Sequence, residues 1–124
     1  MRLSKTGPWQ ENAIDWIHSQ DIAVPAEPAT GWHVARPSIE ARAHALQIVR
    51  DFADANFVPT ALNITLDRGI ELDWQRGRKT VELEILADGS IELSKCVDGV
   101  AISEITLEKP GWRINEAFDW IEKP

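Results

Sequence analysis

The residues of this chain that could do chemistry are carboxylates spaced two apart along one stretch of sequence. Glu71 and Asp73 alternate with Leu72 and Trp74, and acidic residues continue to alternate with apolar ones downstream. The acidic members of this pattern are Glu71, Asp73, Glu82, Glu84, Glu92 and Glu104. Because successive side chains of a β-strand point to opposite faces, we expect these carboxylates to share the outward face of a sheet.

An acidic face of this kind suits several functions. Carboxylates bind hard cations, and a negative surface attracts a basic partner. Two neighbouring carboxylates raise the pKa of one of them, which acid–base catalysis can use. Glutamate is also a common solvated residue on the wet side of a sheet, and that interpretation needs no function. Nothing in the sequence supplies the cleft that a catalytic pair needs, so we assign no catalytic residue, no metal ligand and no cofactor.

The other chemistry-bearing residues fit no known catalytic arrangement. The three histidines, His18, His33 and His44, all precede the acidic stretch and have no helical His–His spacing. Nucleophilic catalysis needs a Ser, Cys or Thr beside an oriented base, and no Gly-x-Ser-x-Gly turn is present. Cys96 is the only cysteine, which excludes an internal disulfide, and we expect it to be buried and inert. These observations predict that the protein is not an enzyme.

The tryptophans are the second unusual feature, because the chain has six of them and no tyrosine. We expect Trp74 to lie in the core with Lys79 as its cross-strand cation–π neighbour, and Trp16 and Trp120 to pack at the core or its edge. The other three stand beside proline or glycine and either cover the core or mark a homodimer or partner contact; they are Trp9, Trp32 and Trp112.

The elements that must position these residues follow from apolar periodicity. Helical spacing predicts a helix from about Pro8 to Gln20 and another from about Ser38, as N-cap, to about Ala55. The second helix has an apolar stripe of Ile39, Ala43, Leu46, Val49 and Ala53, with Phe52 beside it. The proline-containing stretch between the helices, ending at Pro37, is expected to be extended. Farther along, the period changes to two, which indicates five half-buried antiparallel strands and then a short final helix.

We therefore predict one domain over residues 1–124. It comprises an N-terminal helix and extended segment (1–37), a helix (38–56), an antiparallel sheet (61–107) and a C-terminal helix (113–122). The fold class is α+β, a two-layer sandwich of a five-stranded antiparallel meander with helices on one face.

Turn residues predict the strand register. Three-residue loops ending in Gly69 and Gly89 suit bulged hairpins, with each glycine in the left-handed conformation. Counting outward from the turns and from Arg76-Gly77 aligns apolar with apolar residues. The expected pairs are Leu66–Ile70, Ile64–Leu72, Leu62–Trp74, Leu72–Val81, Ile70–Leu83, Glu71–Glu82, Ile85–Ile91, Leu83–Leu93 and Glu84–Glu92. The Asp98-Gly99 turn pairs Val97 with Val100, and a bulge near Ser103 returns Ile105 and Leu107 to the apolar face.

The stretch from Val58-Pro59 through Gly69-Ile70-Glu71-Leu72-Asp73-Trp74 to Asp88-Gly89-Ser90-Ile91 resembles a pattern of small bacterial α+β proteins of unassigned activity. In that pattern a helix leads through proline into a hairpin ending in Leu-x-Trp, followed by an acidic strand and an Asp-Gly turn. The resemblance covers roughly a third of the chain and consists of turn and core positions. It implies a fold and no activity or binding residue.

Charge narrows the classes of partner. The net charge of −7, with 20 acidic against 13 basic residues in 124, argues against nucleic acid and anionic membranes. No apolar stretch approaches the roughly 20 residues of a membrane helix, and we expect a cytoplasmic protein. The favoured function is a non-enzymatic interaction domain, in its most concrete version an acidic antitoxin-like or immunity-like neutraliser of a basic partner. The alternative is a small ligand-binding or divalent-cation-binding domain, or an enzyme, that uses the acidic face.

Overall fold

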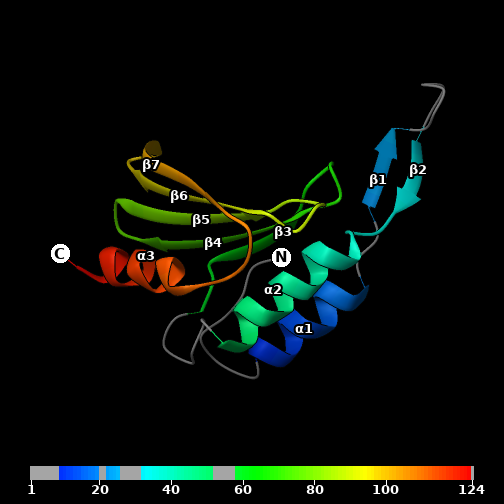
Figure 1. Ribbon diagram of the computed structural model, residues 1–124, viewed down its shortest axis with the longest axis horizontal. Coiled ribbons are helices and arrows are strands. Elements are labelled where there is room, and N and C mark those ends of the chain that lie inside the picture. Colours follow the sequence, from blue (N-terminus) through cyan, green and yellow to red (C-terminus); the bar gives the residue numbers. More distant parts are fainter. Residues whose placement is uncertain (1–8, 20–21, 26–31, 52–57, 124) are drawn as a thin grey trace.

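The computed structural model of the chain describes residues 9–19, 22–25, 32–51 and 58–123. Its elements, in chain order, are α1 (Trp9–Ser19), β1 (Ile22–Pro25), β2 (Trp32–Ala35), α2 (Ile39–Asp51), β3 (Ala61–Ile64), β4 (Ile70–Arg76), β5 (Lys79–Ile85), β6 (Ile91–Val97), β7 (Val100–Leu107) and α3 (Trp112–Glu122). Strands β3 to β7 form one sheet in sequence order, with every neighbouring pair antiparallel. Figure 1 shows α1, α2 and α3 on one side of this sheet. The predicted α+β fold with a five-stranded meander is confirmed.

The core lies between the helices and the sheet. Every second residue from Ile70 to Trp74 in β4 and from Val81 to Ile85 in β5 is buried there, as the alternating sequence requires. Trp74 of β4 stacks at a tilt on Phe118 of α3 with ring centroids 4.8 Å apart. Helix α3 contributes a stripe of residues at helical spacing, namely Ile114, Ala117, Phe118 and Ile121. The apolar stripe of the helix, with its spacing of three to four residues, packs on the apolar face of the sheet, with its spacing of two. Both apolar surfaces are thereby removed from water.

Ser38 fixes the start of α2, as predicted. Its Oγ accepts a hydrogen bond from the Ala41 N–H at 3.0 Å, and its own N–H donates to the Arg68 carbonyl at 3.0 Å. The first bond is an N-cap, and the second ties the helix to the β3–β4 loop. The predicted apolar stripe of α2 is wrong at its start, because Ile39 is 75% exposed and Ala43 is exposed.

The stripe that α2 buries consists of Ala41, Ala45, Ile48 and Val49. The expected members Ala53 and Phe52 lie outside the described residues. At 3.6 residues per turn, Ile39 lies on a different side of α2 from Ala41, Ala45 and Ile48, so the face that α2 buries excludes it.

The predicted register is wrong by two residues in the first two hairpins. Ile64 pairs with Ile70 and Leu72 pairs with Leu83, so Glu71 lies opposite Glu84 and Asp73 opposite Glu82. Leu62 correspondingly pairs with Leu72, and Trp74 with Val81. A slip of two residues keeps every side chain on its own face, so the apolar pattern could not reveal it.

The β3–β4 loop explains part of this slip. Arg68, and not Gly69, has the positive φ, of 64°. Glycine is needed at 69 for a different reason, because a Cβ there would lie 2.4 Å from the Ile85 carbonyl oxygen. The backbone of β5 therefore passes against the loop too closely for a side chain.

The later hairpins match the prediction. Ile85 pairs with Ile91 and Glu84 with Glu92, and Gly89 has a φ of 90°. The expected bulge is also present, between the pairs Lys95–Ser103 and Cys96–Ala101, and it leaves Ile102 without a partner on β6. Beyond it, Ile105 pairs with Leu93 on the apolar face, as predicted, and Leu107 pairs with Ile91.

The expected extended segment before α2 contains a second, two-stranded sheet. Strands β1 and β2 pair antiparallel from Ile22–Ala35 to Pro25–Trp32. In Figure 1 this hairpin stands apart from the five-stranded sheet, beyond one end of the two-helix layer. Among the described helices, none combines the length and apolar character needed to cross a membrane.

Candidate acidic interface

The predicted carboxylates come together on the face of the sheet opposite the helices. Glu71 and Asp73 lie on β4, and Glu82 and Glu84 lie on β5, each half-buried between its neighbours. Glu92 of β6 continues the row and is exposed. Glu104 extends it onto β7, where it pairs with Ser94. We call these six residues the acidic face.

Three members of the acidic face are especially close. Carboxylate oxygens of Glu71, Asp73 and Glu82 all lie within 4.8 Å of one another. Asp73 and Glu82 are directly opposed across β4 and β5, while Glu71 is the neighbour two residues along the same strand as Asp73. Like charges in such positions repel one another, so this part of the sheet carries an electrostatic cost.

Asp73 is the member of this group whose pKa is strongly raised. Burial, together with the charge of Glu71, a hydrogen bond with its carboxyl and the charge of Glu82, raises the pKa of Asp73 to about 7. Its Oδ1 is buried and has no hydrogen-bond partner within the part of the chain that the structure describes. Near neutral pH the Asp73 carboxyl therefore shares its population between the protonated and ionised forms.

The two acidic residues of β5 are shifted in the same direction. Burial raises the pKa of Glu82, with smaller effects of Glu71 and Glu104. Burial also raises the pKa of Glu84, followed by the charges of Glu92 and other acidic neighbours. These shifts reflect partial burial first and the charge of neighbouring carboxylates second.

The described ion pairs lie elsewhere on the molecule. Arg78 pairs with Asp98 at the β4–β5 and β6–β7 turns, and Arg76 Nε lies 3.4 Å from a Glu122 carboxylate oxygen of α3. No basic side chain in the described ranges forms a salt bridge with a member of the acidic face. Within residues 9–19, 22–25, 32–51 and 58–123, the face therefore presents carboxylates without salt-bridged cations.

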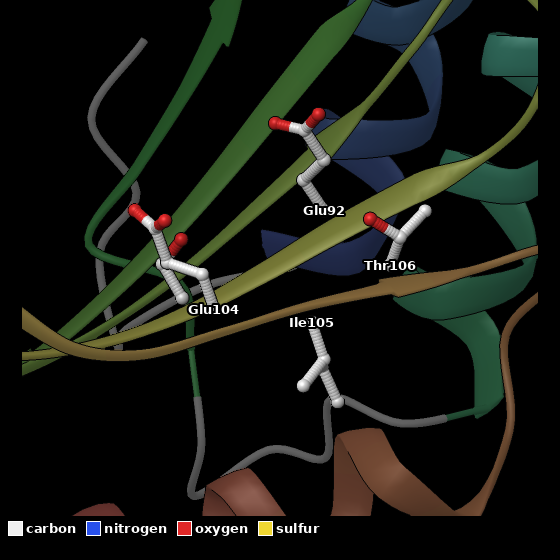
Figure 2. A pocket seen from close by; sticks show the side chains of 5 residues that line it. Glu92, Glu104, Ile105 and Thr106 are labelled. Atoms are coloured by element: carbon white, nitrogen blue, oxygen red, sulfur yellow. The ribbon is translucent and has the colours of Figure 1, made fainter.

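A hollow lies at the β7 end of this face. It has a volume of about 310 Å³ and is lined by Glu92, Ser94, Glu104, Ile105 and Thr106. Figure 2 shows the side chains of Glu92, Glu104 and Thr106 on the same side of strands β6 and β7, with Ile105 pointing the opposite way. The hollow thus offers two carboxylates and two hydroxyls, which accept hydrogen bonds from cationic groups.

Cys96 lies on the same side of β6 as Ser94 but is only 5% exposed. Burial raises the pKa of its thiol, with further effects of Glu82 and Glu104. The expectation of a buried cysteine is confirmed, and the raised pKa disfavours the reactive thiolate.

The tryptophan predictions divide. For Trp9 the core alternative is correct and the surface assignment is wrong, because it is 5% exposed and belongs to the core cluster. Trp112 is 64% exposed and remains a candidate, with Arg113 stacked 5.1 Å from its ring centroid. Trp32 lies on β2, but its side chain is outside what the structure describes.

The expected Trp74–Lys79 contact is also wrong, because the register shift pairs Trp74 with Val81. Lys79 lies 4.9 Å from the Trp120 ring centroid and donates hydrogen bonds to the Trp120 and Lys123 carbonyls at 3.1 and 2.8 Å. Sequence reasoning missed this role, since the last carbonyls of a helix leave no signal in the sequence that points to a distant lysine.

His44 has a structural partner. Its Nδ1 hydrogen-bonds the Gly89 carbonyl oxygen at 2.6 Å, which joins α2 to the β5–β6 turn. The contact gives the His44 ring a hydrogen-bond partner within the fold.

Comparison with protein-family models, curated proteins and solved structures finds no significant match to this chain. The resemblance to small bacterial α+β proteins therefore stays a prediction, and functional inference depends on the geometry of the acidic face.

Proposed function

We propose that this chain is a non-enzymatic interaction protein whose acidic face binds and neutralises a basic protein partner, in the manner of an antitoxin or immunity protein. The observation that carries the proposal is the convergence of six carboxylates on the helix-free face of one sheet, three of them within 4.8 Å, with no described salt bridge to any of them. A cytoplasmic location is part of the proposal, and the single free cysteine, Cys96, is compatible with a reducing compartment.

The electrostatics support a cationic partner. Ammonium and guanidinium groups placed among Glu71, Asp73 and Glu82 would form charge-assisted hydrogen bonds and would replace mutual repulsion by attraction. Because the pKa of Asp73 is raised to about 7, part of its population is protonated near neutral pH. Binding a cation would favour the ionised form and release that proton. A net charge of −7 would also steer a basic partner toward the protein at low ionic strength.

The test uses the full chain and a defined probe, a lysine-rich peptide of net charge about +4, with affinity measured by calorimetry at low and at near-physiological salt. We expect binding that weakens with salt and a loss of about tenfold in the double variant Glu82→Gln/Glu84→Gln. The matched control removes two exposed charges from α1, Glu11→Gln/Asp15→Asn, and should leave affinity within about twofold. Equal losses in both variants would show that only net charge matters and would overturn the proposal.

The alternative function is binding of a divalent cation by Glu71, Asp73 and Glu82. Their oxygens are close enough to share one ion, which is the observation in its favour. Thermal melts with and without millimolar Ca²⁺, Mg²⁺ and Mn²⁺ decide this alternative. An unchanged melting temperature with all three metals would exclude it without touching the interaction proposal.

A further inference from the structure

The β7 edge of the sheet is long and exposed. Strand β7 has eight residues, against four in β3 at the other edge, and in the described sheet it has a strand neighbour only on its β6 side. Its residues 100–104 are all exposed, and Val100 and Ile102 are 67% and 59% exposed. An exposed, unpaired edge of this kind is a template for another strand.

The hydrogen-bond alternation shows which residues of β7 face the free edge. Leu86 N–H donates to the Ser90 carbonyl at 2.8 Å and Asp98 N–H donates to the Arg78 carbonyl at 2.8 Å, so even-numbered residues of β6 bond toward β5. Odd-numbered residues such as Leu93 then bond toward β7, which makes Leu93–Ile105 a hydrogen-bonded pair. Glu104 and Thr106 therefore direct their N–H and C=O groups away from β6, toward the open edge.

The same two residues line the acidic hollow with their side chains. In an antiparallel pair, residues directly opposite each other place their side chains on the same face. Residues of an added strand opposite Glu104 and Thr106 would thus reach the hollow and its carboxylates. The residue between them, opposite Ile105, would point to the other face, beside the half-buried Ile105 side chain.

We propose that the basic partner binds as an extended segment of alternating basic and apolar residues, added antiparallel to the free edge of β7. Its backbone bonds to Glu104 and Thr106, its basic side chains enter the hollow between Glu92 and Glu104, and its apolar side chain covers Ile105. Main-chain bonds supply affinity, and the alternating side chains supply specificity. The regular part of the edge runs from Ser103 to Leu107, because the bulge at Ile102 interrupts it. This inference rests on the proposed function, which it makes more specific.

The experiment compares two peptides of equal charge. One alternates lysine with valine over seven residues, and the other alternates lysine with proline and cannot pair as a strand. We expect the valine peptide to bind the full chain at least tenfold more tightly, and to slow amide hydrogen exchange at Glu104 and Thr106 but not in β3.

The variant that isolates the edge is Thr106→Pro. Its proline removes an N–H that points outward and leaves the β6–β7 bonds in place, a position that tolerates proline in edge strands. We expect it to abolish the preference for the valine peptide. Should this variant fail to fold, a valine peptide N-methylated on the residues that face β7 gives the same readout on the unmodified chain.

The possible outcomes distinguish failure of strand addition at β7 from failure of the proposed function of the acidic face. Equal binding of both peptides, weakened in both cases by Glu82→Gln/Glu84→Gln, would overturn strand addition and keep the acidic-face function. Binding of neither peptide at low salt would overturn both. A dimer in light scattering that Thr106→Pro converts to monomer would assign the edge to a second copy of the chain and would overturn this inference.

Discussion

Leu72 and Asp73 are neighbours in β4, yet they belong to surfaces with opposite energetics. Leu72 is fully buried against the helices, where apolar contact stabilises the fold. Asp73 lies on the open face, where burial and two nearby carboxylates raise its pKa to about 7. The comparison teaches that the covered face supplies stability, whereas the raised pKa of Asp73 makes the acidic face oppose folding when its carboxylates are ionised.

The largest expected effect comes from Trp74→Ala on the covered face. Trp74 is fully buried and contacts Phe118 of α3, so truncation should lower the free energy of unfolding by about 3–5 kcal/mol. Urea denaturation followed by circular dichroism measures it. The matched change on the acidic face is Glu92→Ala, which should alter stability by about 0.5 kcal/mol or less because Glu92 is exposed. Comparable losses in the two variants would contradict the division of roles.

An intermediate effect is expected for Lys79→Met at the end of β5. The ammonium group donates to two carbonyls at the end of α3 and lies over the Trp120 ring, so its removal should cost about 1–2 kcal/mol. The exposed Lys109 provides the control, Lys109→Met, with about 0.5 kcal/mol or less. Thermal melts of both variants make the comparison, and an unchanged Lys79→Met melt would show that α3 does not depend on this anchor.

The smallest expected effect is the dependence of the free energy of unfolding on pH, which comes from the acidic face. The raised pKa of Asp73 means that the folded state binds a proton between its ordinary value of 3.8 and about 7. Stability should therefore rise as pH is lowered from 8 to 5, and Glu82 and Glu84 add shifts of the same sign.

Asp73→Asn removes this titration. It should stabilise the protein by about 1 kcal/mol at pH 8, a value reduced for the partial exposure of the carboxyl, and should flatten the slope of stability against pH. Denaturation midpoints at pH 5, 6.5 and 8 provide the measurement. A variant less stable than the parent at pH 8 would show that ionised Asp73 has a favourable partner.

The sequence predicted which face of the sheet each side chain occupies better than it predicted which residues pair across neighbouring strands. Alternation of acidic and apolar residues is a property of period two, so it assigned Glu71, Asp73 and Glu82 to one face correctly. Register depends on the loop conformation, and the left-handed residue is Arg68 where glycine was expected. The pairing of Glu71 with Glu84 could not be found from the pattern, because a slip of two residues leaves it unchanged.

The extent to which individual side chains are buried was the other property that could not be predicted from the sequence. Trp9 follows a proline, and its sequence position left both a cover over the core and a partner contact open, whereas the packing of α1 places it in the core. The partial burial of Asp73 likewise depends on how neighbouring strands pack around it, which no local spacing reports. Tertiary packing thus decides how deeply both residues are buried, which the local pattern leaves open.

The bulge at Ile102 bears on how many chains can join at one edge. A straight, flat edge strand that pairs with an identical strand presents the same free edge again. Repeated strand addition of this kind leads to fibres. A bulged strand bends, so its free edge is straight for only a few residues and can pair only with a short segment. The extra residue that returns Ile105 to the core thereby also protects the protein from runaway polymerisation.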